Sequence, residues 1–209
     1  MYSLWIANKN YSSWSLRPWI LLKVLNIPFK EHQALFNSGG SSYEKFTVFS
    51  PTGQVPCLID DQQIIWDSLA ICEYIAEDHP HAWPQDRQAR AWARSAAAEM
   101  HSGFLALRQN CPMECTTRLA MLEISNELKQ NIMRLETLWQ EGLDKFGGPW
   151  LAGEQFTAVD AFFAPIAFRI QSYQLPVNDV VQQWVEQTLT LSAMQEWYQA
   201  ASNEELIDH

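Results

Sequence analysis

The sequence has no uninterrupted apolar segment of the roughly 18 residues that a membrane helix requires. Its start, MYSLWIANKN, lacks the basic and apolar regions of a signal peptide. Basic residues are also scarce, 14 against 24 acidic ones, which gives a net charge of −10. A surface of this charge repels phosphate backbones and anionic lipids. We therefore expect a cytoplasmic protein that binds neither nucleic acid nor membranes.

Cysteine is scarce as well, and the four cysteines are Cys57, Cys72, Cys111 and Cys115. In a reducing compartment they should be free thiols. Three residues separate Cys111 from Cys115, and there is no second ligand pair nearby, so we predict no metal site. The chain does have 47% hydrophobic residues and 10 tryptophans among its 209 residues, enough for a substantial core.

The first 78 residues predict the order strand, helix, strand, helix, strand, strand, helix. The expected elements are a strand over 2–7, a helix over 15–26, a strand over 29–35, a short helix over 43–49, strands VPCLI and QQIIW around a turn at Asp60–Asp61, and a helix over 69–78. A strand–helix–strand unit normally forms a right-handed parallel crossover. The order is that of an α/β thioredoxin-like domain.

The second part of the chain predicts helices only. The segment HPHAWPQD, 79–86, has two prolines and no periodicity, and we interpret it as a linker. Helical periodicity then covers 87–110, 116–146, 157–172, 179–190 and 192–203, with a break at Cys111–Pro112. The predicted domains are therefore 1–78, a linker over 79–86, and an all-α helical bundle over 87–209.

Hydroxyl groups gather between the first predicted strand and helix, where Ser12, Ser13 and Ser15 lie. A helix N-terminus carries partial positive charge and free N–H groups, which favour a bound anion. A thiol of pKa about 8.5 placed there would ionise one or two pH units lower. The alternative, that Ser13 and Ser15 only cap the helix, stays open at this point.

Two further segments suggest the binding of an extended peptide. A cis bond between Val55 and Pro56 would turn the Val55 backbone outward for β-type pairing. Asp67 and Ser68 begin a predicted helix, where the N-terminus and the serine can receive a carboxylate and the aspartate an ammonium group. The alternative for the second pair is an N-cap without a ligand.

The runs SPTGQVPCLID (50–60) and WDSLAICEYIAE (66–77) resemble the glutathione-site signature of the cytosolic glutathione transferases. The run SSWSLR, 12–17, resembles the SSCSxR motif of the zeta class. The resemblance implies that Ser12 supplies the hydroxyl to the glutathione thiolate, with Ser13 as the second candidate. It also implies a homodimer and glutathione contacts from Trp14, Gln54, Val55, Pro56, Asp67 and Ser68.

The sequence departs from that class in two places. Trp14 replaces the cysteine of the motif and is expected to narrow the pocket, and the polar motif for the isomerase substrate is missing. At helical spacing Met100, Phe104 and Arg108 share a face, with His101 one step round. These four residues are our candidates for the substrate pocket, and a helix-packing face is the alternative. Phe156–Asp160 resembles the family's capping box.

We therefore expect a glutathione S-transferase that uses glutathione as co-substrate and activates its thiolate for attack on a small hydrophobic electrophile. One alternative is a glutathione-dependent cis–trans isomerase similar to maleylacetoacetate isomerase. The other is a glutathione-binding module without catalysis.

Overall fold

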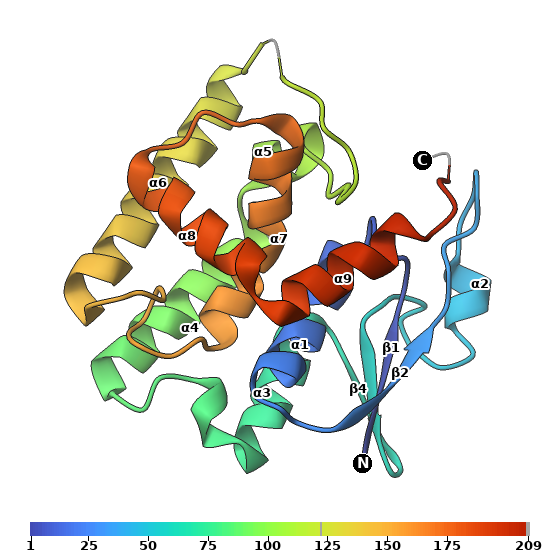
Figure 1. The fold of residues 1–209 in the computed structure, drawn as a ribbon. Coiled ribbons are helices and arrows are strands. Elements are labelled where there is room, and N and C mark those ends of the chain that lie inside the picture. The colour runs from blue at the N-terminus through green and yellow to red at the C-terminus, as the bar shows by residue number, and fades with distance from the viewer. Residues whose placement is uncertain (122, 208–209) are drawn as a thin grey trace.

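The computed structural model describes residues 1–121 and 123–207. The N-terminal elements are β1 (Tyr2–Ile6), α1 (Ser13–Val24), β2 (Phe29–Gln33), α2 (Tyr43–Phe46), β3 (Cys57–Asp60), β4 (Gln63–Trp66) and α3 (Ser68–Asp78). The strands form one sheet in the order β2-β1-β3-β4, with β1 parallel to β2 and antiparallel to β3. The predicted order of elements is confirmed, and Figure 1 shows α1 and α3 between the sheet and the helical half.

The hairpin turn lies one residue later than predicted. Asp60 pairs with Gln63, so the connecting residues are Asp61 and Gln62 rather than Asp60 and Asp61. Asp61 takes a left-handed conformation with φ of 50°. Aspartate tolerates this region better than most side chains, which explains why the chain turns there.

The helical half contains η1 (Pro80–Ala82), α4 (Arg87–Ser102), α5 (Leu105–Asn110), α6 (Asn126–Phe146), α7 (Ala158–Tyr173), α8 (Asp179–Thr190) and α9 (Ser192–Ser202). The last three agree with the predicted helices to within about one residue. The predicted division at residues 79–86 stays a prediction, although this stretch holds η1 and a buried Trp83.

The prediction of one helix over 87–110 is wrong. The helix ends at Ser102, and Phe104 takes a left-handed conformation with φ of 55° before α5 begins. A Cβ at Gly103 would lie 2.7 Å from the Glu99 carbonyl oxygen, so the chain leaves the helix where a glycine permits close approach. The bend turns the Phe104 ring edge-on to Phe163 in the core. Met100, Phe104 and Arg108 therefore do not share a helix face.

The prediction of a helix over 116–146 is correct only from Asn126 onward. Ser125 caps α6 by accepting a hydrogen bond from the Leu128 N–H at 3.2 Å. Before it, the N–H groups of Leu119 and Met121 donate to the carbonyls of Ser172 and Tyr173 at the end of α7. These long-range bonds hold the segment extended, while residue 122 lies outside the described part of the chain.

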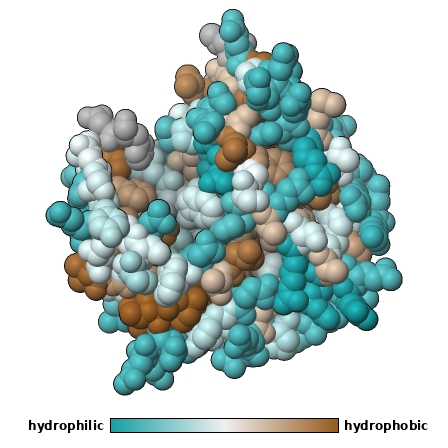
Figure 2. Space-filling model, turned by 180° about the vertical axis from the view of Figure 1, so that it is seen from behind, coloured by the Kyte–Doolittle hydropathy of each residue, from teal (hydrophilic) through white to brown (hydrophobic). Residues whose placement is uncertain are grey.

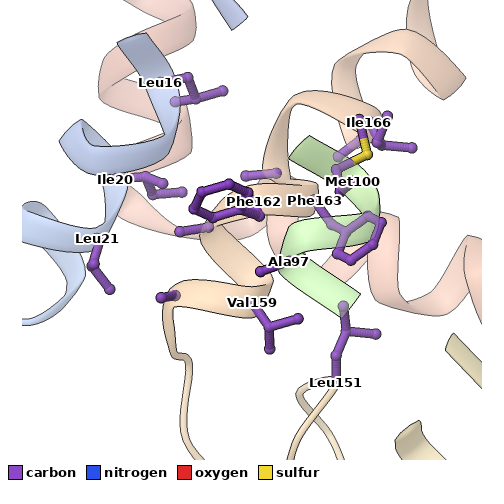
Figure 3. Packing of buried hydrophobic residues seen from close by; sticks show 14 of the residues in the cluster. Leu16, Ile20, Leu21, Ala97, Met100, Leu151, Val159, Phe162, Phe163 and Ile166 are labelled. Carbon is purple, nitrogen blue, oxygen red and sulfur yellow. The ribbon is translucent and has the colours of Figure 1, made fainter. Parts of the chain in front are cut away.

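One hydrophobic core joins the two halves. Figure 3 shows Leu16 and Ile20 of α1 facing Phe162 of α7, with Met100 of α4 on the other side of that helix. Helix α7 is buried along nearly its whole length. Contacts between α1 and α7 therefore fix the first helix, and the loop before it, against the helical half.

The predicted capping box at the start of α7 is present. Asp160 Oδ2 accepts from the Thr157 N–H at 3.0 Å, and Oδ1 accepts from the Leu151 N–H at 2.9 Å. Complete burial raises the pKa of Asp160 to about 6 in spite of these bonds. The carboxylate thus links the loop before α7 to its first turn.

Among the described residues, no helix has the length and apolar character needed to cross a membrane. Figure 2 shows hydrophilic residues over much of the rear face, with apolar groups in separate patches between them.

Candidate functional site

A cleft of about 1110 Å³ lies beside the N-terminus of α1 and the start of α3. All eight predicted catalytic and glutathione-binding residues line it, namely Ser12, Ser13, Trp14, Gln54, Val55, Pro56, Asp67 and Ser68. The structure therefore brings together three short segments that are separated by up to about fifty residues in sequence.

The Ser12 hydroxyl faces its own helix. Ser12 is 4% exposed and donates to Ser15 Oγ at 2.7 Å, and Ser15 Oγ accepts from the Ala7 N–H at 3.3 Å. Helix α1 begins at Ser13, and no side chain caps it at Ser12. Ser13 and Ser15 therefore do not cap this helix, contrary to the alternative. Ser15 instead connects the helix to the residue that follows β1.

The Ser13 hydroxyl is held through its oxygen. Ser13 Oγ accepts from Arg169 Nη2 at 3.2 Å, and the same guanidinium donates to the carbonyls of Arg108 and Cys111. Among the hydrogen bonds of the described residues, none uses the Ser13 proton. A hydroxyl whose oxygen accepts from a guanidinium is polarised to donate to an anion.

The Val55–Pro56 peptide bond is cis, which meets the condition stated for peptide binding at this motif. Gln54 is exposed and Val55 half-buried beside the cleft. The hydrogen bonds of the described chain use neither the N–H nor the C=O of Val55. This backbone pair is therefore available to an extended peptide, in the manner of an added strand.

Asp67 is the N-cap of α3 and bonds in two directions. Its Oδ1 accepts from the N–H groups of Leu69 and Ala70, at 2.8 and 3.3 Å. Its Oδ2 lies 3.2 Å from His101 Nε2. Ser68 is fully buried, and its Oγ accepts from Arg17 Nη1 at 3.3 Å. Asp67 therefore caps the helix, as the alternative for this pair proposed, and both residues also line the cleft.

Trp14 stands between the cleft and a group of positive charges. The guanidinium carbons of Arg17 and Arg108 lie 4.1 and 4.6 Å from the centre of its ring, and the His101 ring meets it edge-on at 5.1 Å. Burial and repulsion from Arg108 and Arg169 lower the pKa of Arg17 to about 9. These cations add positive potential behind the helix N-terminus, while Trp14 itself lines the cleft.

The four residues predicted for the substrate pocket are not among the described residues that line this cleft, and their role stays a prediction. Met100 and Phe104 are in the core, and His101 and Arg108 contact Trp14 without appearing among the described lining residues.

The helical half contributes Pro112, Met113 and Glu114, none of which is among the site residues predicted from the sequence. The predicted helix break at Cys111–Pro112 could have indicated them, because loop residues that follow a helix often line a binding site. Glu114 Oε2 accepts from Thr117 Oγ1 at 2.7 Å. Asp67 and Glu114 are the charged residues in the described lining, which includes no basic side chain.

No group of three or more potential metal ligands occurs among residues 1–121 and 123–207. All four cysteines are buried free thiols, and burial raises the pKa of Cys57 and Cys111 to about 11. The absence of a metal stays a prediction.

Sequence models of two domains match the chain. The glutathione S-transferase N-terminal domain matches residues 11–78, and the glutathione S-transferase C-terminal domain matches residues 117–200. The chain belongs to the glutathione S-transferase family. The N-terminal match includes all the cleft residues from Ser12 to Ser68, and the C-terminal match covers most of the helical half.

This transferase is similar to proteins with two different names. It is 26% identical to the glutathione S-transferase GstB of Escherichia coli, over 90% of this chain and 92% of that protein. It is also 26% identical to a probable maleylacetoacetate isomerase of Caenorhabditis elegans, over 85% of this chain and 81% of that protein. A glutathione transferase homologue from Burkholderia, solved with bound glutathione, has the same fold, with a TM-score of 0.72, 22% identity and coverage of 97% and 99%.

Proposed function

We propose that this glutathione S-transferase binds glutathione along the cleft and joins the glutathione sulfur, with the tripeptide still attached, to the electrophilic carbon of a small molecule. The observation that carries the proposal is the convergence of the Ser12–Ser13 hydroxyls, the free Val55 backbone pair and the Asp67–Ser68 helix start on one cleft. A tripeptide with a central cysteine requires such a succession of a thiolate site, a strand-like backbone partner and a site for its charged end.

In this proposal the thiol loses its proton to solvent, and the thiolate is stabilised at the start of α1. The helix N-terminus supplies positive potential, and the Ser12–Ser13 pair supplies a hydroxyl donor. The family motif favours Ser12, while the hydrogen bonds favour Ser13, whose proton is uncommitted and whose oxygen is polarised by Arg169. The thiolate then forms the new carbon–sulfur bond as a leaving group departs with its electron pair. With an activated double bond, the π electrons move onto the activating group instead, and the resulting anion takes a proton from solvent.

Glutathione binding uses the other two segments. The cysteinyl backbone pairs with the N–H and C=O of Val55, beside Gln54 and Pro56. The ammonium group of the γ-glutamyl end contacts Asp67, and its carboxylate contacts the start of α3 at Ser68.

The second substrate in this proposal is a neutral or cationic aromatic electrophile. Trp14 of α1 and Met113 and Glu114 of the helical half line the same cleft as the two serines. Aromatic and thioether side chains favour an apolar ring, and the carboxylate of Glu114 disfavours an anion.

The isomerase alternative is supported by relatives named maleylacetoacetate isomerase. The chemistry of the described lining opposes it, because that substrate carries carboxylates and Trp14 covers Arg17 and Arg108. Incubation with maleylacetoacetate separates the two activities, since an isomerase converts it without net consumption of glutathione.

Substitution of each serine tests the proposal. Ser12→Ala and Ser13→Ala are compared for the pH dependence of kcat/KM with chlorodinitrobenzene and for glutathione affinity by calorimetry. Loss of the donor hydroxyl should lower kcat/KM by about 100-fold and leave the glutathione Kd within about threefold. If neither variant loses activity, a serine hydroxyl is not the thiolate donor. If the wild type binds no glutathione, the proposed function is wrong.

Two coarser features belong to the same proposal. The unpaired thiols support a cytoplasmic location. A homodimer stays a prediction, supported by the exposure of Ile64 and Trp66 on the edge strand β4, both nearly half exposed.

A further inference from the structure

The loop between β1 and α1 carries three buried polar residues. Asn8, Lys9 and Asn10 are 2%, 6% and 1% exposed, and only Tyr11 separates them from Ser12. The Asn8 carbonyl accepts from the Ser12 N–H at 2.8 Å and from the Tyr11 N–H at 3.2 Å. The position of this loop therefore determines where the Ser12–Ser13 pair stands in the cleft.

The backbone donors of this loop are bound by a residue almost two hundred positions away. Glu204 Oε1 accepts from the Lys9 N–H at 2.7 Å, and Oε2 accepts from the Asn10 N–H at 2.9 Å. Gln33 Nε2 donates to Oε1 at 2.6 Å. Two consecutive amides directed at one carboxylate form charge-assisted hydrogen bonds, which are stronger than those to a neutral acceptor.

The acceptors of the loop are bound from the helical half too. Trp197 Nε1 of α9 donates to the Lys9 carbonyl at 2.7 Å. The Cys115 N–H donates to the Asn10 carbonyl at 3.2 Å, and the Thr116 N–H donates to Asn10 Oδ1 at 3.1 Å. Figure 1 shows α9 crossing α1 toward the sheet, which brings the chain after it to the loop.

We infer that Glu204 is a positioning residue for the thiolate site, acting through the backbone of Lys9 and Asn10 on the Ser12–Ser13 pair. This inference rests on the proposed function. Glu204 is not among the described residues that line the cleft, so it acts on the thiolate site through the loop. Its carboxylate fixes the loop conformation from which the hydroxyl pair meets the sulfur, so its removal misplaces the donors while the glutathione-binding segments at Val55 and Asp67 stay in place.

The isosteric change Glu204→Gln tests this role. A glutamine has one acceptor oxygen and places an NH₂ group against the second amide, so one of the two backbone donors loses its partner. We expect the pH midpoint of thiolate formation, followed by ultraviolet absorbance of bound glutathione, to rise by about one pH unit. We expect kcat/KM at neutral pH to fall about tenfold, while the glutathione Kd changes less than about threefold.

Glu205→Gln is the matched control, since it makes the same charge change at the exposed neighbouring position. Glu196→Gln on α9 is a second control, which removes an exposed ion pair with Lys23 of α1. Both should titrate like the wild type. If Glu204→Gln does not fold, Glu204→Asp keeps both oxygens one methylene further away and should give a smaller shift in the same direction.

The outcomes are distinguishable. A wild-type protein that ionises bound glutathione, together with a folded Glu204→Gln variant that titrates identically, overturns the positioning role and leaves the proposed function intact. Hydrogen exchange of the Lys9 and Asn10 amides, measured without glutathione, should be faster in Glu204→Gln, and unchanged exchange also overturns it. A wild type that forms no bound thiolate overturns both proposals.

Discussion

At the scale of single residues, His101 joins the two halves of the molecule at the predicted glutathione site. Its Nε2 lies 3.2 Å from Asp67 Oδ2, and its Nδ1 is buried without a hydrogen-bond partner. Burial lowers the pKa of His101 against the opposing effect of Asp67, with Arg17 and Arg108 adding to the decrease. The imidazole is therefore neutral at pH 7, and its Nε2–H donates to the carboxylate.

Replacing His101 with Leu should weaken glutathione binding. Asp67 Oδ2 loses its donor from α4, so its carboxylate is less well oriented toward an ammonium group. We expect the KM for glutathione to rise about fivefold, the equivalent of one hydrogen bond of about 1 kcal/mol, with kcat nearly unchanged. Steady-state kinetics with glutathione varied measures this, and His101→Gln should recover part of the affinity. A change confined to kcat would contradict the assignment.

The same histidine gives a pH dependence of stability. A folded-state pKa below the ordinary value of 6.5 means that the unfolded chain binds a proton more readily. The contribution of His101 is thus complete above pH 6.5 and decreases as the pH falls toward the folded pKa. Urea unfolding of the wild type and of His101→Gln over this range should show a steeper loss of unfolding free energy in the wild type.

At the scale of an element, helix α7 depends on one buried carboxylate. Asp160→Ala leaves the N–H groups of Leu151 and Thr157 without their acceptor in the interior. We expect the free energy of unfolding to fall by about 3 kcal/mol, because each unsatisfied buried donor costs about 1–3 kcal/mol. Asp179→Ala, in the exposed first turn of α8, is the control and should cost less than about 1 kcal/mol. Equal losses in the two variants would mean that the capping box does not stabilise the fold.

How far the elements could be predicted depends on whether their signals are local. The strands and the last three helices follow from periodicity and caps within their own segments, and the three site segments are each a few residues long. The breaks at Gly103–Phe104 and before Asn126 could not be predicted in this way. Apolar periodicity continues through Phe104, whereas the helix ends at Gly103 and the Phe104 ring packs on Phe163 beyond that break. The extended segment before α6 is held by carbonyls of α7.

The same distinction applies to the site. The motifs predict the side of the cleft formed by Ser12, Val55 and Asp67. They could not predict the side formed by Met113 and Glu114, because its position depends on how the helical half docks against α1. The carboxylate of Glu204 reaches Lys9 across 195 residues of sequence, and no local pattern indicates such a contact.

At the scale of the whole molecule, the shared core makes the two halves one cooperative unit. Phe162 of α7 is fully buried, and its ring lies 4.8 Å from the Arg17 guanidinium and faces Leu16 and Ile20 of α1 (Figure 3). Neither half buries this ring by itself, so loss of the ring weakens the contact on which both depend.

We therefore expect Phe162→Ala to lower the free energy of unfolding by about 3–5 kcal/mol, with tryptophan fluorescence and far-ultraviolet circular dichroism reporting the same midpoint. Tryptophans lie in both halves, including Trp19 of α1 and Trp184 of α8, so fluorescence follows the loss of either one. Met133→Ala, on the exposed face of α6, is the control and should change the midpoint little. Two separated transitions in the variant would show that the α1–α7 contact joins domains that unfold independently. Because Ser12 and Ser13 lie at the start of α1, the thiolate site of such a protein would also be held less rigidly against the helical half.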